Sequence, residues 1–333
     1  MARSDEVVVV AGGVGAARFL RALRLHAPQS RVTALVNTGD DTVVNGLHVS
    51  PDIDTVIYTL ADAIDPVRGW GLRDETWTAM QSLPRYAAVR PTPASAPNDW
   101  FNLGDRDLAT HLYRTARLSE GATLTEVTRE IAQAWGVEFA IVPMSNDRVA
   151  TMVELAEDAK TTDGHIYRRG DVVSFQEYFV RLRHDVAIAQ VEFDGASTAE
   201  VQHLNSLSDS SLVVIAPSNP IVSIGPVRAL RGVNEALAAR RNSVVAISPI
   251  IGGAALKGPA DRMLRELGME ATALGVARLY SDICGTLVID NVDASLAPAI
   301  EALGMRCIVT DTVMKSDDIA RALAETVTSL VRR

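Results

Sequence analysis

The chain has 333 residues, of which 47% are apolar, enough to bury a core in one large or two modest domains. It carries 32 Lys and Arg against 41 Asp and Glu, a formal net charge of -9 at pH 7. This composition excludes a disordered chain, and an acidic sequence without a basic block is a poor candidate for nucleic-acid binding. The two cysteines, Cys284 and Cys307, are too few for a disulfide framework or a four-thiolate zinc site.

The N-terminal residues indicate neither export nor membrane insertion. Acidic residues precede the first apolar run, whereas a signal peptide begins with a basic region. No stretch approaches the roughly 20 consecutive apolar residues that a spanning helix needs. We therefore expect a soluble, cytoplasmic protein that binds neither membrane nor nucleic acid.

The first 41 residues have the pattern of strand, glycine turn, helix and strand. The strands are expected at 7–10 and 32–36, with the turn at 12–15 and the helix at 16–25. Both strands are continuous apolar runs rather than alternating ones. Such runs suit a parallel sheet that helices cover on both faces.

The middle of the chain has a different pattern, and the opening one returns after it. The middle is expected to hold a loop at 84–98, helices at 105–118 and 124–135, and polar, strand-like segments at 148–153 and 171–183. Apolar strands then follow at 212–216, 244–247, 286–289 and 307–309, with an amphipathic helix at 316–330. We predict an α/β, Rossmann-like, mainly parallel sheet with helices on both faces, formed by 1–84 and 206–333. Residues 85–205 are predicted to be an inserted mixed α+β subdomain.

A glycine-rich turn occupies the place where a phosphate loop would lie. Gly12, Gly13 and Gly15 allow backbone N–H groups to approach an anion at the start of a helix. The turn is not a Walker A loop, and it departs from the dinucleotide fingerprint. Arg18 stands at the third glycine position, and Asn37 stands where a ribose-binding acid is expected. A tight turn without a ligand is the alternative.

Four acidic residues follow on two neighbouring loops. Asp40 and Asp41 come after the second strand, and Asp52 and Asp54 open the next helix. Carboxylates at a helix start can act only as caps, an interpretation that suits Asp52 well. Beside an anion loop, however, they suggest Mg²⁺ facing a polyphosphate, because magnesium favours one or two carboxylates plus substrate phosphates.

Further polar residues lie in later loops. Asp105 could cap the helix that follows it, or Arg106 beside it could hold a phosphate by paired hydrogen bonds. The loops that follow the later strands offer hydroxyl, amide and amino groups of the kind that bind a nucleotide, at Ser218, Asn219, Ser223, Gly225, Ser248, Gly252 and Lys257. For any one of these loops, ordinary turn chemistry is the alternative.

The ordered set of motifs resembles the 2-phospho-L-lactate transferase (CofD/FbiA-like) family of coenzyme F-420 biosynthesis. The motifs are AGGVGAARF at 11–19, VNTGDD at 36–41, SPDIDT at 50–55, GDRD at 104–107, APSNP at 216–220, SIGP at 223–226, SPIIG at 248–252, KGPAD at 257–261 and TDT at 310–312. They cover nearly the whole chain. The segments at 65–71 and 73–77 are most similar to the actinobacterial branch.

The resemblance implies a cytoplasmic homodimer that depends on Mg²⁺ and has two small-molecule substrates. The donor would be lactyl- or enolpyruvyl-2-diphospho-5′-guanosine, and the acceptor the ribityl hydroxyl of the deazaflavin Fo. GMP would leave, and coenzyme F-420-0 or its dehydro form would result. By motif, Asp40 and Asp52 would serve the metal, and Asp54 and Arg106 would be catalytic residues that contact Fo.

The resemblance also assigns the remaining segments. The loops after residue 216 would hold the guanosine diphosphate part of the donor, and 85–205 would help form the deazaflavin site. From the residues themselves, we expect Mg²⁺ and the N–H groups of the glycine turn to neutralise the diphosphate. Two other functions stay open as alternatives. One is a nonenzymatic guanine-nucleotide-binding protein, and the other is an NAD-dependent oxidoreductase, against which Arg18 and Asn37 argue.

Overall fold

The core of the protein is a parallel sheet. The computed structural model describes residues 4–27, 31–87, 89, 100–162 and 164–330. Within them seven strands form one sheet in the order β16-β15-β12-β11-β1-β2-β5, with every neighbouring pair parallel. The strands are β1 (Ser4–Ala11), β2 (Arg31–Val36), β5 (Ala140–Pro143), β11 (Ser210–Ile215), β12 (Val244–Ile247), β15 (Thr286–Asp290) and β16 (Arg306–Thr310). The predicted α/β class and mainly parallel sheet are confirmed.

Both faces of this sheet are buried, which explains the continuous apolar runs. Along β1, Val7 and Val9 belong to the hydrophobic core on one face, and Val8 and Val10 belong to the core on the other. Successive side chains of a strand point to opposite faces, so a strand covered on both sides needs apolar residues at every position.

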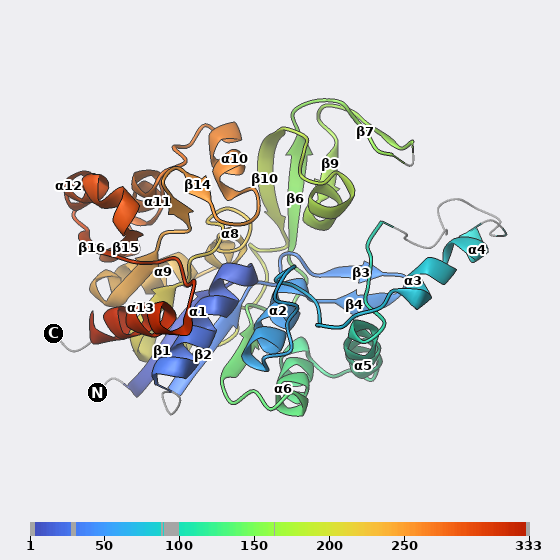
Figure 1. Cartoon of the computed structure of the whole chain (residues 1–333), viewed down its shortest axis with the longest axis horizontal. Coiled ribbons are helices and arrows are strands. Elements are labelled where there is room, and N and C mark those ends of the chain that lie inside the picture. The colour runs from blue at the N-terminus through green and yellow to red at the C-terminus, as the bar shows by residue number, and fades with distance from the viewer. Residues whose placement is uncertain (1–3, 28–30, 88, 90–99, 163, 331–333) are drawn as a thin grey trace.

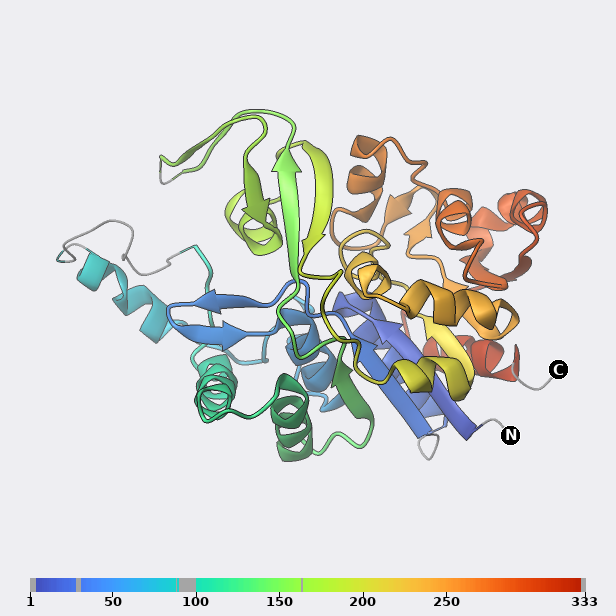
Figure 2. The ribbon, with the colours of Figure 1, turned by 180° about the vertical axis from the view of Figure 1, so that it is seen from behind.

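Two layers of helices supply that cover. One face packs against α1 (Gly13–His26), α2 (Pro51–Leu60), α6 (Leu124–Ala134) and α13 (Asp317–Ser329). The other packs against α7 (Leu204–Asp209), α8 (Gly225–Ala229), α9 (Val233–Ala239), α10 (Ala260–Glu266), α11 (Ala273–Tyr280) and α12 (Ala297–Glu301). In Figure 1, α1 and α13 lie in front of the sheet, and in Figure 2 the sheet is seen from behind.

The strand order fixes where a ligand site is expected. If the seven strands are numbered by their order in the chain, their order across the sheet from β5 is 3-2-1-4-5-6-7. This is the doubly wound arrangement. The chain reverses direction across the sheet between β1 and β11. Connections that leave these two strands diverge, and the crevice beyond their carboxyl ends is the usual ligand site of such folds.

The chain between β5 and β11 builds a second, antiparallel sheet. It contains β10 (Ile188–Asp194), β6 (Ala150–Leu155) and β9 (Val172–Ser174), beside a hairpin of β7 (Ala159–Lys160) and β8 (Ile166–Tyr167). Two elements within the range 85–205 are not part of this second sheet. β5 is a strand of the central sheet, and α6 packs on one of its faces. The prediction of a strand-like segment at 171–183 is wrong beyond Ser174, where the chain forms a π-helix at Glu177–Arg181. This helix buries Tyr178 in the core of the subdomain.

A smaller unit projects from one end of the molecule (Figures 1 and 2). It comprises the hairpin β3 (Thr42–Val44) and β4 (Leu47–Val49), with α3 (Thr78–Ser82), α4 (Pro84–Ala87) and α5 (Asp107–Ser119). The loop predicted at 84–98 begins with α4, and 88 and 90–99 lie outside the described residues.

Short elements complete the fold. They are the hairpin β13 (Ile250–Ile251) and β14 (Ala254–Ala255), and the 3-10 helices Arg241–Ser243 and Asn291–Leu296. In the part of the chain that the structure describes, no helix has the length and apolar character needed to cross a membrane.

Candidate functional site

The glycine turn after β1 is shaped by close backbone approach. A Cβ atom on Gly15 would lie 2.0 Å from the carbonyl oxygen of Pro217, and one on Gly12 would lie 2.9 Å from Asp52 Oδ2. Gly13 has a φ of +69°, in the left-handed region that favours glycine. The turn therefore brings the start of α1 against the loop that follows β11. The N-cap residue, Gly12, has no side chain to cap α1, and Asp52 accepts from the Gly13 N–H. An anion would therefore meet the N–H groups of the residues that follow Gly13 in the first turn.

Asn37 ties the surrounding loops together. Its buried amide nitrogen donates to Asp52 Oδ2 at 2.9 Å and to the Val222 carbonyl at 3.4 Å, and its amide oxygen accepts from the Gly39 N–H at 2.8 Å. One side chain thus joins the loop after β2, the start of α2 and the loop after β11. The position where a dinucleotide site would carry a ribose-binding acid is occupied by an organising amide.

The acids around Asn37 are held in an environment that disfavours their charge. Burial raises the pKa of Asp52 to about 6, although hydrogen bonds from Asn37 and Gly13 oppose the rise. Burial, and then the charge of Asp52, raise the pKa of Asp40 well above its usual range. Burial likewise raises the pKa of Asp41, against a hydrogen bond from Ser50 and the nearby charge of Arg114.

Several oxygen atoms in this cluster lack a partner. Within the described residues, Asp40 Oδ1, Asp41 Oδ1 and Thr38 Oγ1 are buried without a hydrogen bond. Buried, uncompensated oxygen atoms are costly, and they are the donors that a hard divalent cation prefers. The described chain offers no group of three or more His, Cys, Asp or Glu placed to hold a metal ion. A cation here would need further ligands from water or substrate.

Asp54 lies in a different setting from the other three acids. Arg114, which is fully buried, donates to Asp54 from both terminal guanidinium nitrogens, with Nη1 at 3.1 Å from Oδ2. His111 Nδ1 lies 3.2 Å from Arg114 Nη1, and its Nε2 lies 3.3 Å from Asp107 Oδ2. The Tyr58 hydroxyl donates to Asp107 Oδ1 at 2.6 Å. This buried network fastens α2 to α5.

Sequence reasoning missed Arg114. The available signal was the spacing of Asp107, His111 and Arg114, which puts all three on one face of a helix. Nothing in that spacing says that the face meets α2. The pairing of Arg114 with Asp54 therefore comes from the tertiary structure.

Arg106 and its neighbour bind the segment before α3 rather than the acidic loops. The Arg106 guanidinium is exposed and donates to the Arg73 carbonyl at 2.7 Å. Asp105 accepts from the Thr78 N–H at 2.9 Å, so it caps α3. The expectation that Asp105 caps its own helix is wrong, because Glu75 accepts from the N–H groups at the start of α5.

The loop after β11 lies against the glycine turn. Ser218 is buried and donates from Oγ to the Gly12 carbonyl at 2.6 Å. Asn219 Oδ1 accepts from the Ile221 N–H at 2.9 Å, and a Cβ atom on Gly12 would lie 2.8 Å from the Cβ of Ser223. The structure therefore brings these predicted donor-binding residues to the switch point.

The remaining predicted donor-binding residues have partners inside the protein. Ser248 Oγ donates to the Ile250 carbonyl at 2.9 Å, the Gly252 N–H donates to Asp293, and Lys257 Nζ donates to the Arg68 carbonyl at 3.1 Å. A Cβ atom on Gly225 would lie 2.7 Å from Phe193 Cζ. These hydrogen bonds hold the loops in place within the protein. A ligand would have to share or replace them.

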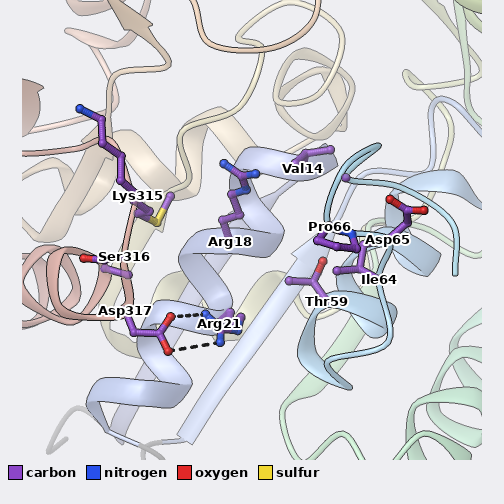
Figure 3. Close-up of a pocket in the computed structure, with 13 residues that line it drawn as sticks. Val14, Arg18, Arg21, Thr59, Ile64, Asp65, Pro66, Lys315, Ser316 and Asp317 are labelled. Carbon is purple, nitrogen blue, oxygen red and sulfur yellow. Dashed lines mark hydrogen bonds and ion pairs between the residues drawn. The ribbon is translucent and has the colours of Figure 1, made fainter. Parts of the chain in front are cut away.

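A cavity of about 240 Å³ lies beside this region, between α1, α13 and the loop that follows α2 (Figure 3). It adjoins the first turn of α1 at Val14, and its lining does not include Asp40, Asp41, Asp52 or Asp54. The lining residues are Val14, Arg18, Arg21, Thr59, Ile64, Asp65, Pro66, Gly69, Met314, Lys315, Ser316, Asp317 and Ala320.

Together these features define a doubly wound α/β protein with an acidic site and a helix start at the switch point. Residues 7–325 match the family model described as 2-phospho-L-lactate transferase CofD. The chain belongs to this family of transferases.

Curated relatives cover nearly the same length. A phosphoenolpyruvate transferase of Streptomyces griseus is 41% identical over 96% of this chain and 96% of its own. One of Mycobacterium tuberculosis is 40% identical over 86% of each chain. The predicted family and its similarity to actinobacterial members are confirmed.

Solved structures share the fold at low identity. A protein of the UPF0052 family from Bacillus halodurans aligns over 98% of this chain and 99% of its own, with a TM-score of 0.57 and 15% identity. Identity this low supports the fold alone.

Proposed function

We propose that the protein transfers a phosphoenolpyruvyl group from enolpyruvyl-2-diphospho-5′-guanosine to the ribityl hydroxyl of the deazaflavin Fo. GMP leaves, and the dehydro form of coenzyme F-420-0 is the product. The lactyl donor and the phospholactyl product are the second candidate. The relatives from Streptomyces and Mycobacterium, which cover 96% and 86% of this chain, are named phosphoenolpyruvate transferases, and this favours the enolpyruvyl donor.

The observation that carries this proposal is the juxtaposition of the acidic loops with the start of α1. Asp52 Oδ2 lies within 2.9 Å of the Cβ position of Gly12 and the carboxylate accepts from the Gly13 N–H, so buried carboxylates and the N–H groups of the first turn of α1 meet at one point. A diphosphate is the kind of ligand that needs both, one to hold a cation and the other to hold its oxygens.

Mg²⁺ fits the donor set at this point. The unpartnered oxygens of Asp40, Asp41 and Thr38, with Asp52 beside them, are hard oxygen ligands that a cation would compensate. Asp40 and Asp52 would hold the ion, which would neutralise charge on the diphosphate when bound. Since two carboxylates suffice for magnesium when phosphates supply further ligands, no larger acidic cluster is needed.

The chain's own groups would supply positioning and charge stabilisation. The N–H groups at the start of α1 would bind phosphate oxygens, and Ser218 and Asn37 would keep the loops around them in place. Asp54 would orient the acceptor hydroxyl from a carboxylate whose geometry Arg114 fixes. Arg106, exposed beside Arg73, would contact Fo.

The test is mass spectrometry of purified protein with Mg²⁺, Fo and each guanylyl donor in separate reactions. Release of GMP with a matching gain in the mass of Fo is the expected result, with the enolpyruvyl donor the faster one. An Asp40→Asn variant is expected to lose turnover, and Asp158→Asn, which changes an exposed carboxylate in the loop between β6 and β7, serves as the matched control. Binding of GDP without turnover would instead support a nonenzymatic nucleotide-binding protein, and NAD binding would support an oxidoreductase.

A further inference from the structure

The cavity beside α1 has a cationic wall that the proposed function does not use. Arg18 and Arg21 line it from one face of α1, and Lys315 lines it from the segment before α13. In Figure 3, the side chains of Arg18 and Lys315 both lie apart from the Arg21–Asp317 pair, with the Arg18 guanidinium on the side of Val14 and the Lys315 amino group extending away from Val14. The cavity lining therefore holds one paired cation, Arg21, and two further cations with exposed side chains, Arg18 and Lys315.

The ion pairs around the cavity do not include Arg18 or Lys315. Arg21 pairs with Asp317 at 2.7 Å and with Asp62 at 3.1 Å. Asp65, the other acid in the lining, pairs with Arg68 at 2.9 Å. Within the described residues, Arg18 and Lys315 make no ion pair within 4.0 Å, although the charge of Lys315 helps to lower the pKa of Asp290.

The size of the cavity limits what it can accept. Pockets for drug-sized ligands measure about 300–1,000 Å³, so a space of about 240 Å³ suits a group of a few heavy atoms rather than a nucleotide. Apolar walls come from Val14, Ile64 and Met314. A short carbon chain with one anionic end matches this combination.

The cavity begins one residue from the acidic site. Asp52 Oδ1 lies 3.7 Å from the Cβ position of Gly13, and the next residue, Val14, lines the cavity. The acidic loops would hold the diphosphate through Mg²⁺, and their carboxylates would repel a further, uncompensated carboxylate, whereas the cavity offers it two cations. Arg18 can bind a carboxylate through paired N–H groups.

We propose that this cavity is a subsite for the carboxylate of the three-carbon group that the enzyme transfers. The assignment rests on the proposed function, and it separates the two ends of that group. The phosphorus lies at the acidic loops and the start of α1. The carboxylate lies between Arg18 and Lys315, with the carbon chain against Val14.

The first test measures steady-state kinetics of Arg18→Gln and Lys315→Gln with the guanylyl donor. Loss of one charged hydrogen bond predicts a rise of about 10- to 100-fold in donor KM for each variant, with KM for Fo unchanged. Arg321→Gln on α13, outside the cavity, removes the same charge and is expected to leave both constants within about twofold. If donor KM stays within twofold in both cavity variants, the subsite is wrong and the transferase assignment stands.

A second measurement does not need turnover. Isothermal titration calorimetry with phosphoenolpyruvate, in the absence of Mg²⁺, is expected to detect binding that Arg18→Gln and Lys315→Gln abolish and that Arg321→Gln retains. Equal binding of inorganic phosphate would identify a phosphate site and overturn the carboxylate assignment, as would absence of any binding to the wild type. If neither donor is turned over but phosphoenolpyruvate binds as expected, the proposed function fails and the small-anion site remains.

Discussion

Replacement of Asp52 by Asn is expected to stabilise the ligand-free protein while it removes activity. In the folded protein the pKa of Asp52 is about 6, against 3.8 for an unperturbed Asp. The folded state therefore binds a proton more tightly than the unfolded chain does. Stability from this group is full at low pH and is lost as pH rises from about 4 to 6.

The size of the effect follows from the two pKa values. Above pH 6 the difference corresponds to about 3 kcal/mol of unfavourable free energy, which an uncharged amide at this position would not carry. The amide oxygen of the Asp52→Asn side chain can still accept from Asn37, but one acceptor is lost near Gly13, at a cost of about 1–2 kcal/mol. The net gain at pH 7.5 is then about 1–2 kcal/mol. At pH 4.5 the electrostatic part falls to about 1 kcal/mol, and the gain disappears.

Urea unfolding of Asp52→Asn and wild type at both pH values, in EDTA, measures this difference. Turnover of the variant is measured in parallel and is expected to be lost. Asp261→Asn, at an exposed ion pair on α10, is the matched control and is expected to change stability by less than about 1 kcal/mol at either pH. A variant that is less stable than wild type at pH 7.5, or equally stabilised at both pH values, would refute the reasoning.

Three other perturbations test the same region. Arg114→Met leaves Asp54 buried without its partner and is expected to cost about 3–5 kcal/mol in urea unfolding, most of which Asp54→Asn in the same chain restores; additive costs would contradict a direct pair. Gly15→Ala forces a Cβ against the Pro217 carbonyl and is expected to cost about 2–3 kcal/mol, whereas Gly46→Ala, with open space around it and only its positive φ to strain, costs about 1 kcal/mol; equal losses of Tm would argue against the close approach. Mg²⁺ at a fixed concentration, 100 times its dissociation constant at pH 7.5, is expected to stabilise the protein by about 2.7 kcal/mol at that pH. The same concentration is expected to stabilise it much less at pH 5, where the acidic loops hold protons; equal Tm shifts at the two pH values would exclude these acids as ligands.

The sequence by itself determined six of the seven strands of the central sheet and the order of its motifs, and it missed the edge strand β5. Runs such as Val7 to Val10 are apolar at every position, and burial on both faces of a parallel sheet is the physical reason for that pattern. The glycines at 12 and 15 predicted a tight turn at the carboxyl end of the first strand, and the contacts with Asp52 and Pro217 account for them. These features are local, so a pattern within a few residues carries them.

Only the tertiary structure decided which side chains meet across the site. Asn37 joins three loops that are as much as 185 residues apart, and Arg114 reaches Asp54 over a separation of 60 residues. The helical spacing around Arg114 does not indicate which helix its face meets, and nothing in the sequence indicates which loops Asn37 joins. The pKa of Asp52 depends in the same way on burial by segments distant in the chain. Residue types and spacing indicate which groups are available, whereas helix packing and loop contacts determine their charge, their partners and their chemistry.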